Sequence, residues 1–192
     1  NIDQERFKPD DMRAPPFENI NPGRSNRKCQ RTLYCAIDRD TCIAEVRPFK
    51  GAGVAVSEIA RSRDARVVDF ASELPLVHPL CVENIGWHVQ IRQLLEHISY
   101  LFSLPANPDS SALYYAPTQS LCESLRQAGY DGIRYRSSLN EGGINFAFFD
   151  PDLGKPSEPE YYWIDEIAIR FSDYKPDEAE HPYLYEYRRS KP

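Results

Sequence analysis

Three polar side chains near the start of the chain follow one another at nearly equal intervals and could together bind and act on an anionic ligand. Arg24 precedes Tyr34 by ten residues, and Tyr34 precedes Glu45 by eleven. A guanidinium holds anionic groups, a phenol ring stacks on a planar ligand, and a carboxylate stabilises a developing positive charge. Each residue also has an ordinary explanation: a solvated or paired arginine, a core tyrosine, and a surface glutamate beside Arg47.

The local sequence predicts a coil, a strand and a short helix that would bring these three residues together. Residues 9–30 are rich in Pro and Asn and predict a long irregular stretch, which in a compact domain is often functional. Residues 32–37 predict a strand, because β-branched and aromatic residues favour strands. Asp38 or Asp40 can cap a helix that runs to about Val46, and Pro48 stops it.

The rest of the chain predicts short strands and two longer helices. Apolar residues recur at spacings of three and four over 87–104, which predicts an amphipathic helix ended by Pro105. A second helix is expected to begin near Thr118 and to stop at Gly129. Short strands with helices between them indicate an α+β fold. Strands are predicted over residues 6–8, 54–59, 66–70, 132–136, 144–149 and 161–171, with a Pro/Gly-rich connector after Asp150.

The composition is that of a globular chain with an acidic body. Of the 192 residues 41% are hydrophobic and 27% are charged, and we interpret 1–192 as one domain with a core over about 6–150 and a strand and tail over 151–192. The net charge of −6 divides into +2 over residues 1–51 and −8 over the remainder. The acidic body argues against direct binding of nucleic acid or of an anionic membrane, and the basic start favours a confined pocket for a small anion. No apolar run approaches the roughly 18 residues of a membrane-spanning helix.

The five cysteines and four histidines show no metal-ligand spacing. An odd number of cysteines in a chain of this size argues against a disulfide framework. We therefore expect reduced, mostly buried thiols and no metal site. The amino terminus shows no signal-peptide pattern, which together with the thiols predicts a cytoplasmic protein. The cysteines are Cys29, Cys35, Cys42, Cys81 and Cys122.

Short motifs that contain these residues stand in a fixed order along the chain. They are Arg24-Ser25-Asn26, Leu33-Tyr34-Cys35-Ala36, Ala44-Glu45-Val46, Ala116-Pro117-Thr118-Gln119, Asp131-Gly132-Ile133 followed by Ser137, and Gly142-Gly143-Ile144-Asn145. In this order they resemble the RES-domain family, bacterial NAD-consuming toxins named for an Arg, a Glu and a Ser. The resemblance covers roughly residues 6–150. The chain departs from the family at residues 27–30, where relatives show Pro and Gly, and at Arg136, which replaces a frequent Pro.

The resemblance implies an ADP-ribosyltransferase-like fold with a split antiparallel β core and a few flanking helices. It also implies cleavage of NAD between nicotinamide and ribose, with ADP-ribose passing to inorganic phosphate or to water, as in an NAD phosphorylase or NAD glycohydrolase. NAD is then the substrate, no cofactor is needed, and the partner is the cognate antitoxin of a toxin–antitoxin system in the bacterial cytoplasm. Carried over residue by residue, the catalytic residues are Arg24, Tyr34, Glu45 and Ser137, and the NAD-binding residues are Arg6, Phe7, Arg24, Tyr34, Gln119 and Asn145.

The chemistry of this cleavage gives the residue types a role. The reaction builds positive charge on the ribose, which Glu45 would stabilise, and nicotinamide leaves neutral without a general acid. Arg24, helped by Arg6, would hold phosphate or the pyrophosphate, and Tyr34 would stack on nicotinamide. The Ser137 hydroxyl would orient a ribose hydroxyl or Glu45 itself.

Several alternatives stay open from the sequence. Ser138 could hold the role of Ser137, and Gln119 could be a hydrogen bonder at a helix start instead of a ligand contact. The acceptor of ADP-ribose could be a macromolecule, which would make the protein an ADP-ribosyltransferase. The chain could also be a catalytically inactive binding module, although all four residues of the predicted catalytic set are present.

Overall fold

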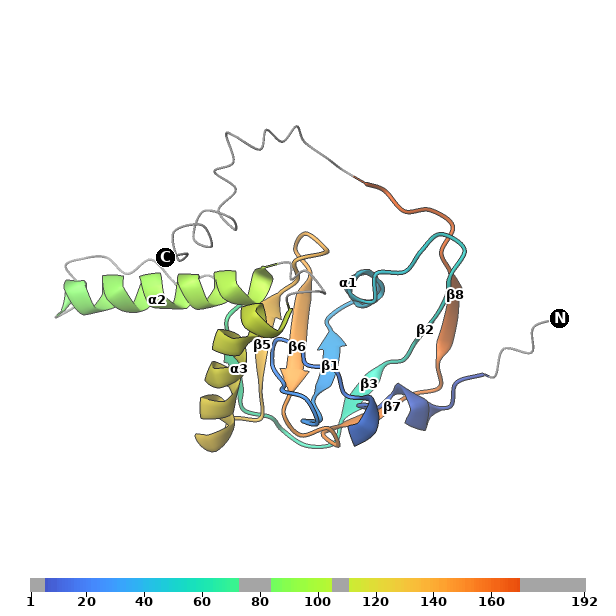
Figure 1. Cartoon of the computed structure of the whole chain (residues 1–192), viewed down its shortest axis with the longest axis horizontal. Coiled ribbons are helices and arrows are strands. Elements are labelled where there is room, and N and C mark those ends of the chain that lie inside the picture. The colour runs from blue at the N-terminus through green and yellow to red at the C-terminus, as the bar shows by residue number, and fades with distance from the viewer. Residues whose placement is uncertain (1–5, 73–83, 105–110, 170–192) are drawn as a thin grey trace.

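Both helices and strands occur in the part of the chain that the computed structural model describes, which is residues 6–72, 84–104 and 111–169 (Figure 1). Two 3₁₀ helices come first, η1 (Pro9–Met12) and η2 (Phe17–Asn19). The α-helices are α1 (Arg39–Glu45), α2 (Ile85–Ser103) and α3 (Ser111–Gln127). The strands are β1 (Leu33–Ala36), β2 (Gly53–Val56), β3 (Ile59–Arg61), β4 (Val67–Asp69), β5 (Gly132–Arg136), β6 (Ile144–Phe148), β7 (Gly154–Pro156) and β8 (Glu160–Trp163).

The main sheet of the described residues has four strands in the order β1-β6-β5-β4. β1 and β5 both run antiparallel to β6, so Leu33 and Gly132 each stand opposite Phe148. β4 runs parallel to β5, because α2 and α3 follow β4 and carry the chain back across the sheet before β5 begins. The predicted α+β class is confirmed, but the core is mixed and not purely antiparallel. Its kinship with ADP-ribosyltransferases stays a prediction.

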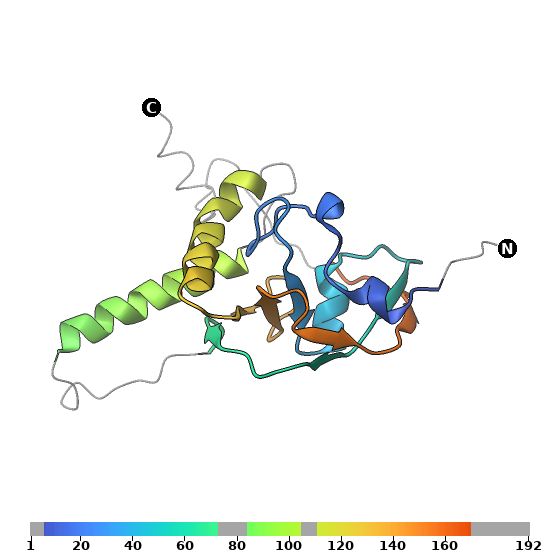
Figure 2. The same cartoon turned by 90° about the horizontal axis from the view of Figure 1, so that it is seen from below.

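α2 and α3 cover one face of this sheet and form the larger hydrophobic core against β5 and β6. The rings of Phe70 and Phe102 stack there with centroids 5.5 Å apart. Figures 1 and 2 both show the two helices together at one side of the sheet and the β2–β8 pair at the other. The buried members of this core are Phe70, Phe102, Cys122, Ile133, Tyr135, Ala147 and Phe149.

Two antiparallel ribbons, β2–β8 and β3–β7, lie on the other side of the main sheet. Gly53 pairs with Trp163 in the first ribbon, and Ile59 pairs with Pro156 in the second. A smaller core of Leu33, Phe148 and Leu153 fills the space beneath them. Each ribbon therefore joins the first third of the chain to residues about a hundred positions later.

The short helix α1 forms as predicted. The Asp38 side chain caps it by accepting a hydrogen bond of 2.8 Å from the backbone N–H of Thr41, which satisfies a donor that the first helical turn leaves free. The helix ends at Glu45, and Arg47 then adopts a positive φ of 49° just before Pro48. This abrupt end places the Glu45 side chain at the terminus of the helix.

Three strand predictions differ from the structure. Residues 6–8 form no strand, because none of the described segments pairs with them before η1 begins at Pro9. The predicted strand 54–59 is two strands, since Ser57 and Glu58 leave the ladder to bond Ser157. β8 ends at Trp163 and not at Phe171. Only Ile164 continues the pairing, through backbone hydrogen bonds with Gly51 and Ala52 at the turn before β2, and residues 170 and 171 lie outside the described residues.

Two further predictions are corrected along the chain. The second helix begins at Ser111 and continues through Pro117, where the sequence predicts a start near Thr118. A proline inside a helix removes a backbone hydrogen bond and disfavours the helix, so tertiary contacts of α3 must outweigh that cost. The connector after Asp150 contains strand β7, which the sequence did not predict. The long helix predicted over 87–104 is confirmed as α2, with its start two residues earlier.

Candidate functional site

The Glu45 carboxylate is held by two side chains that come from the far end of the described chain. Its Oε1 accepts a hydrogen bond of 2.7 Å from the Ser137 hydroxyl and one of 2.6 Å from Nδ2 of Asn145. Within the described residues its other oxygen makes no hydrogen bond, and the Glu45 residue is exposed. The structure thus fixes one oxygen of the carboxylate and leaves the other open to a ligand.

The turn that carries Ser137 is itself fastened to α1. The Ser137 hydroxyl accepts hydrogen bonds of 3.1 Å from the backbone N–H groups of Leu139 and Asn140. The Asn140 side chain donates a 2.8 Å hydrogen bond to the buried hydroxyl of Thr41 in α1. Gly143 closes the turn so tightly on α1 that an added Cβ would lie 2.5 Å from the Thr41 hydroxyl oxygen. Ser137 and Glu45 therefore cannot move independently.

Tyr34 has an open ring and a buried hydroxyl. The residue as a whole is 44% exposed, but its hydroxyl donates a 2.7 Å hydrogen bond to Oδ1 of Asn26 and accepts one of 3.1 Å from the backbone N–H of Ser25. Ser25 and Asn26 are both fully buried. Burial of the hydroxyl raises the pKa of Tyr34 to about 12, against the opposing effect of the Ser25 hydrogen bonds. The phenol is therefore protonated and fixed, and its ring face stays available for stacking.

Gln119 holds the loop that carries Arg24 and Ser25. Its Nε2 donates hydrogen bonds of 2.8 and 2.9 Å to the backbone carbonyls of Gly23 and Asn26. The Asn26 side chain supports the same loop from inside, through bonds of 3.0 Å to the carbonyls of Asn21 and Arg27. In this arrangement both donors of the Gln119 amide serve the loop. Gln119 is therefore a structural hydrogen bonder, but it lies inside α3 and not at a helix start as the alternative supposed. Its contact with NAD stays a prediction.

Arg24 reaches from this loop towards the Ser137 turn. Its guanidinium carbon lies 5.7 Å from the centre of the Tyr115 ring, a cation–π contact, and Nη2 lies 3.5 Å from the Ser138 hydroxyl. Among the described residues no carboxylate lies within 4.0 Å of it. A cation without a carboxylate partner can hold the anionic part of a ligand.

Tyr115 and Tyr135 are site residues that the sequence did not single out. Tyr115 supports Arg24 from α3, and Tyr135 lies under the site on β5. Burial raises the pKa of Tyr135 well above its ordinary value; the charges of Tyr34 and Glu45 add to this, and Arg24 opposes it. The alternation of side chains along β5 could have indicated Tyr135, because it lies two residues before Ser137 and residues two apart in a strand point to the same face. No such pattern indicated Tyr115, because Pro117 led the sequence analysis to predict the start of this helix after Tyr115.

Arg6 and Phe7 lie apart from the other predicted residues. They line a hollow of about 610 Å³ together with Glu158, Pro159 and Tyr161. The Tyr161 hydroxyl donates a 3.2 Å hydrogen bond to the Phe7 carbonyl. The structure therefore brings six of the eight predicted residues together and leaves these two elsewhere, so their part in NAD binding stays a prediction.

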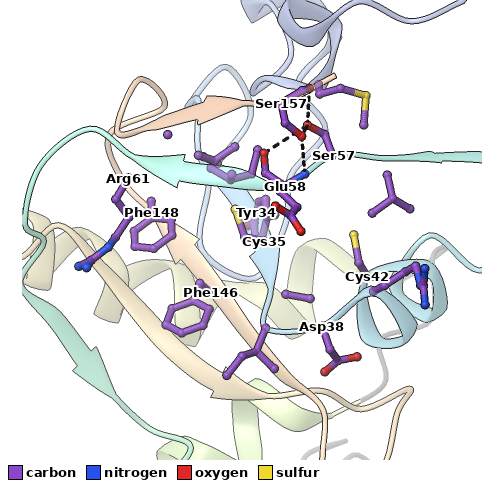
Figure 3. A pocket seen from close by; sticks show the side chains of 18 of the residues that line it. Tyr34, Cys35, Asp38, Cys42, Ser57, Glu58, Arg61, Phe146, Phe148 and Ser157 are labelled. Atoms are coloured by element: carbon purple, nitrogen blue, oxygen red, sulfur yellow. Dashed lines mark hydrogen bonds between the residues drawn. The ribbon is translucent and has the colours of Figure 1, made fainter. Parts of the chain in front are cut away.

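A cavity of about 980 Å³ lies on the opposite face of the main sheet (Figure 3). Of the predicted site residues only Tyr34 lines it, while Cys35, Cys42, Phe146 and Phe148 supply much of its wall. Burial raises the pKa of the Cys35 thiol to about 12, so this thiol is not a nucleophile at neutral pH. Size alone favours this cavity, but the convergent polar groups lie at Glu45, and we place the candidate site there.

The described cysteines are free thiols with different exposures. Cys122 is buried and Cys35 and Cys42 are half-buried, whereas Cys29 is exposed and corrects the expectation of mostly buried thiols. Cys81 lies outside the described residues. Within the described ranges no group of three or more His, Cys, Asp or Glu is placed to hold a metal ion, and no helix is long and apolar enough to cross a membrane.

Comparison with known proteins adds one finding to this geometry. Residues 2–166 match the RES domain family, a range that includes every residue of the candidate site and extends past the roughly 6–150 expected from the motifs. A search of curated proteins and a search of solved structures each found no match.

Proposed function

The chain belongs to the RES domain family, and we propose that it cleaves NAD between nicotinamide and ribose and passes ADP-ribose to inorganic phosphate or to water. One observation carries this proposal. The Glu45 carboxylate is anchored through a single oxygen by Ser137 and Asn145, with Arg24 and Tyr34 on the neighbouring elements. A fixed carboxylate, a cation without a carboxylate partner and an open aromatic ring are what this cleavage needs.

The bond that breaks joins the ribose carbon C1′ to the nicotinamide ring nitrogen. Its electron pair goes to the ring, so nicotinamide leaves neutral and the ribose becomes oxocarbenium-like. The open oxygen of Glu45 would face this carbon and stabilise its charge, while Ser137 and Asn145 hold the other oxygen. Because the hydrogen bonds exist before the substrate binds, the carboxylate needs no rearrangement as the charge develops.

The acceptor then forms a new bond to C1′. A phosphate oxygen gives ADP-ribose 1″-phosphate, and a water molecule gives ADP-ribose with release of its proton. Arg24 would offset the repulsion between the anionic acceptor and the NAD pyrophosphate, and its contact with the Tyr115 ring would hold the guanidinium in place. Tyr34, whose hydroxyl is fixed by Ser25 and Asn26, would stack on nicotinamide.

Product analysis tests the proposal. The purified chain is incubated with NAD labelled in the adenylate part, with and without inorganic phosphate, and the products are separated. Free nicotinamide with ADP-ribose or its phosphate ester is the expected result. Label on protein or nucleic acid from an added lysate would indicate macromolecular transfer instead. Intact NAD in every mixture would contradict catalysis and leave the binding-module alternative.

We also propose that a cognate antitoxin protein covers the site in the bacterial cytoplasm. Val46, Phe49 and Trp163 are large apolar residues that are 62%, 73% and 63% exposed. Val46 and Phe49 follow the end of α1, and Trp163 ends β8, where it pairs with Gly53. A partner packed on them would stand beside Glu45. The free thiols of the described cysteines suit a reducing compartment. Loss of NAD cleavage when the product of the adjacent gene is added would support this proposal, and full cleavage in a stable complex would contradict it.

A further inference from the structure

Tyr135 is a buried residue whose hydroxyl has no hydrogen-bond partner among the described residues. Only 5% of the residue is exposed. The side-chain atoms that are both fully enclosed and unpartnered in the described chain belong to Ser25, Thr32 and Arg126. The Tyr135 hydroxyl is not one of them, so it retains a small accessible surface. A buried tyrosine hydroxyl ordinarily has a partner, and this one is open to an incoming group.

The strand register places Tyr135 on the same face of the sheet as the residue that anchors the carboxylate. Tyr135 on β5 stands opposite Asn145 on β6, and residues that stand opposite each other in a sheet point to the same face. On that face the Asn145 amide donates to Glu45. The Phe102 ring packs against the Tyr135 ring with centroids 5.4 Å apart and so restricts its orientation. Backbone pairing on one side and a ring contact on the other hold Tyr135 in place.

Three groups of the candidate site influence the phenol electrostatically. Burial is the main reason that the pKa of Tyr135 is raised, and the charges of Tyr34, Glu45 and Arg24 all act on it. The hydroxyl therefore stays protonated and can both donate and accept a hydrogen bond.

We propose that Tyr135 is a further substrate-contacting residue, and that its hydroxyl hydrogen-bonds a hydroxyl of the ribose that Glu45 faces. This inference rests on the proposed NAD cleavage. The ribose is the part of NAD that must lie against Glu45. It offers a 2′-hydroxyl on the carbon next to the one that becomes positive, and a 3′-hydroxyl one carbon further on. A site that hydrogen-bonds a substrate hydroxyl discriminates strongly against analogues without it.

A cycle of enzyme and substrate changes tests this contact. Wild type and Tyr135→Phe are compared on NAD and on analogues that lack the 2′- or the 3′-hydroxyl of the nicotinamide ribose. We expect Tyr135→Phe to lower kcat/KM for NAD about tenfold or more. On one of the two deoxy analogues the same variant should lose little further activity, because the partner of the hydroxyl is already gone.

Stability separates this role from a structural one. If the hydroxyl has no protein partner, Tyr135→Phe should unfold at the same temperature as wild type or higher. Tyr130→Phe is the matched control, since Tyr130 is a half-buried tyrosine that stacks under Arg66, away from the site. It should keep wild-type kinetics on all three substrates.

Each other result has a definite meaning. Equal activity of Tyr135→Phe and wild type on NAD would overturn the inference, as would an equal loss on NAD and on both analogues. A Tyr135→Phe chain that fails to fold or melts earlier would also overturn it, because the hydroxyl would then have a structural partner. Failure of the proposed function itself appears differently, as absence of NAD cleavage in the wild type.

Discussion

Nδ2 of Asn145 lies 2.6 Å from Oε1 of Glu45, although the two residues are 100 positions apart in the sequence. Asn145 is buried on β6 and is fixed by the main sheet, whereas Glu45 ends a helix of seven residues. The sheet therefore determines where the carboxylate points. Ser137 contributes the second hydrogen bond to the same oxygen, at 2.7 Å.

Glu45→Gln should abolish most NAD cleavage without unfolding the chain. The amide keeps the shape of the carboxylate but loses the charge that stabilises the ribose cation. A loss of about 10²–10³-fold in kcat is expected, by analogy with other single groups that stabilise charge in a transition state. Initial rates of nicotinamide release measure it.

Glu18→Gln serves as the matched control for this change, because Glu18 is exposed on η2 and makes no side-chain hydrogen bond or ion pair within the described part of the chain. Circular dichroism should show both variants folded. Wild-type turnover by Glu45→Gln would remove the carboxylate from the mechanism.

Asn145→Asp should give the reaction a new pH dependence. The substitution sets a second carboxylate against Glu45, and two carboxylates that share a site raise the pKa of one of them. As the pH falls through that raised pKa the pair gains a proton, so activity of the variant should decline towards acid sooner than in wild type. Rates between about pH 5 and 8 would show this.

Ser137→Ala supplies the comparison for the Asn145 variant. It removes one of the two hydrogen bonds to Glu45 without adding charge, so it should lower kcat roughly tenfold with an unchanged pH profile. Identical profiles for Asn145→Asp and Ser137→Ala would contradict the predicted coupling of the two carboxylates.

The Tyr34 hydroxyl should stay protonated throughout any assay range. Because burial raises the pKa of Tyr34 to about 12, the ultraviolet absorbance difference between wild type and Tyr34→Phe should rise only as the pH nears 12. A free tyrosine amide titrates near pH 10 and gives the reference. A rise at pH 10 in folded protein would mean that the hydroxyl is not held as the structure places it.

The ion pair between Asp69 and Arg134, at the edge of the main sheet, should make the free energy of unfolding depend on pH. Partial burial opposes ionisation of Asp69, but hydrogen bonds from Ser72, Ala71 and Arg134 outweigh it and lower the pKa to about 2. A depressed pKa stabilises the fold above the unfolded value of 3.8, and this contribution disappears as the pH falls towards 2.

Asp69→Asn should therefore be less stable than wild type at pH 7 by about 1 kcal/mol, a modest effect because the Asp69 side chain is 39% exposed. Urea unfolding at several pH values should show the difference narrowing below pH 4. Asp152→Asn, at an exposed carboxylate of the turn before β7, is the control. A difference that widens in acid would refute the assignment.

Local patterns predicted much of the secondary structure because those elements depend on nearby residues. α1 follows from the Asp38 cap and from Pro48, and α2 follows from its apolar spacing. The strands of the main sheet were predicted wherever the sequence has a sufficiently long run of β-branched or aromatic residues. β7 was missed because Gly154, Lys155 and Pro156 have low strand propensity and are paired by tertiary context.

The candidate site could be predicted only as a set of residues, and not as an arrangement. The family resemblance named Glu45, Ser137 and Asn145, and the structure gives the hydrogen bonds between them. No local pattern carries such contacts, since they depend on how β5 and β6 register. Tyr135 shows the same limit. The strand pattern predicts that the residue is buried, but it does not predict that its hydroxyl lacks a hydrogen-bond partner among the described residues.

The long-range pairing of the Glu45 carboxylate also sets when it can act during synthesis. A ribosome that adds 5–20 residues per second needs about 5–20 s to travel from codon 45 to codon 145. The chain lacks both donors of the carboxylate until Ser137 is added, and lacks the second until Asn145 follows eight residues later. The ribbons β2–β8 and β3–β7 also wait for residues beyond 153. If the proposed NAD cleavage depends on this anchored carboxylate, a chain cut short before Ser137 should be inactive.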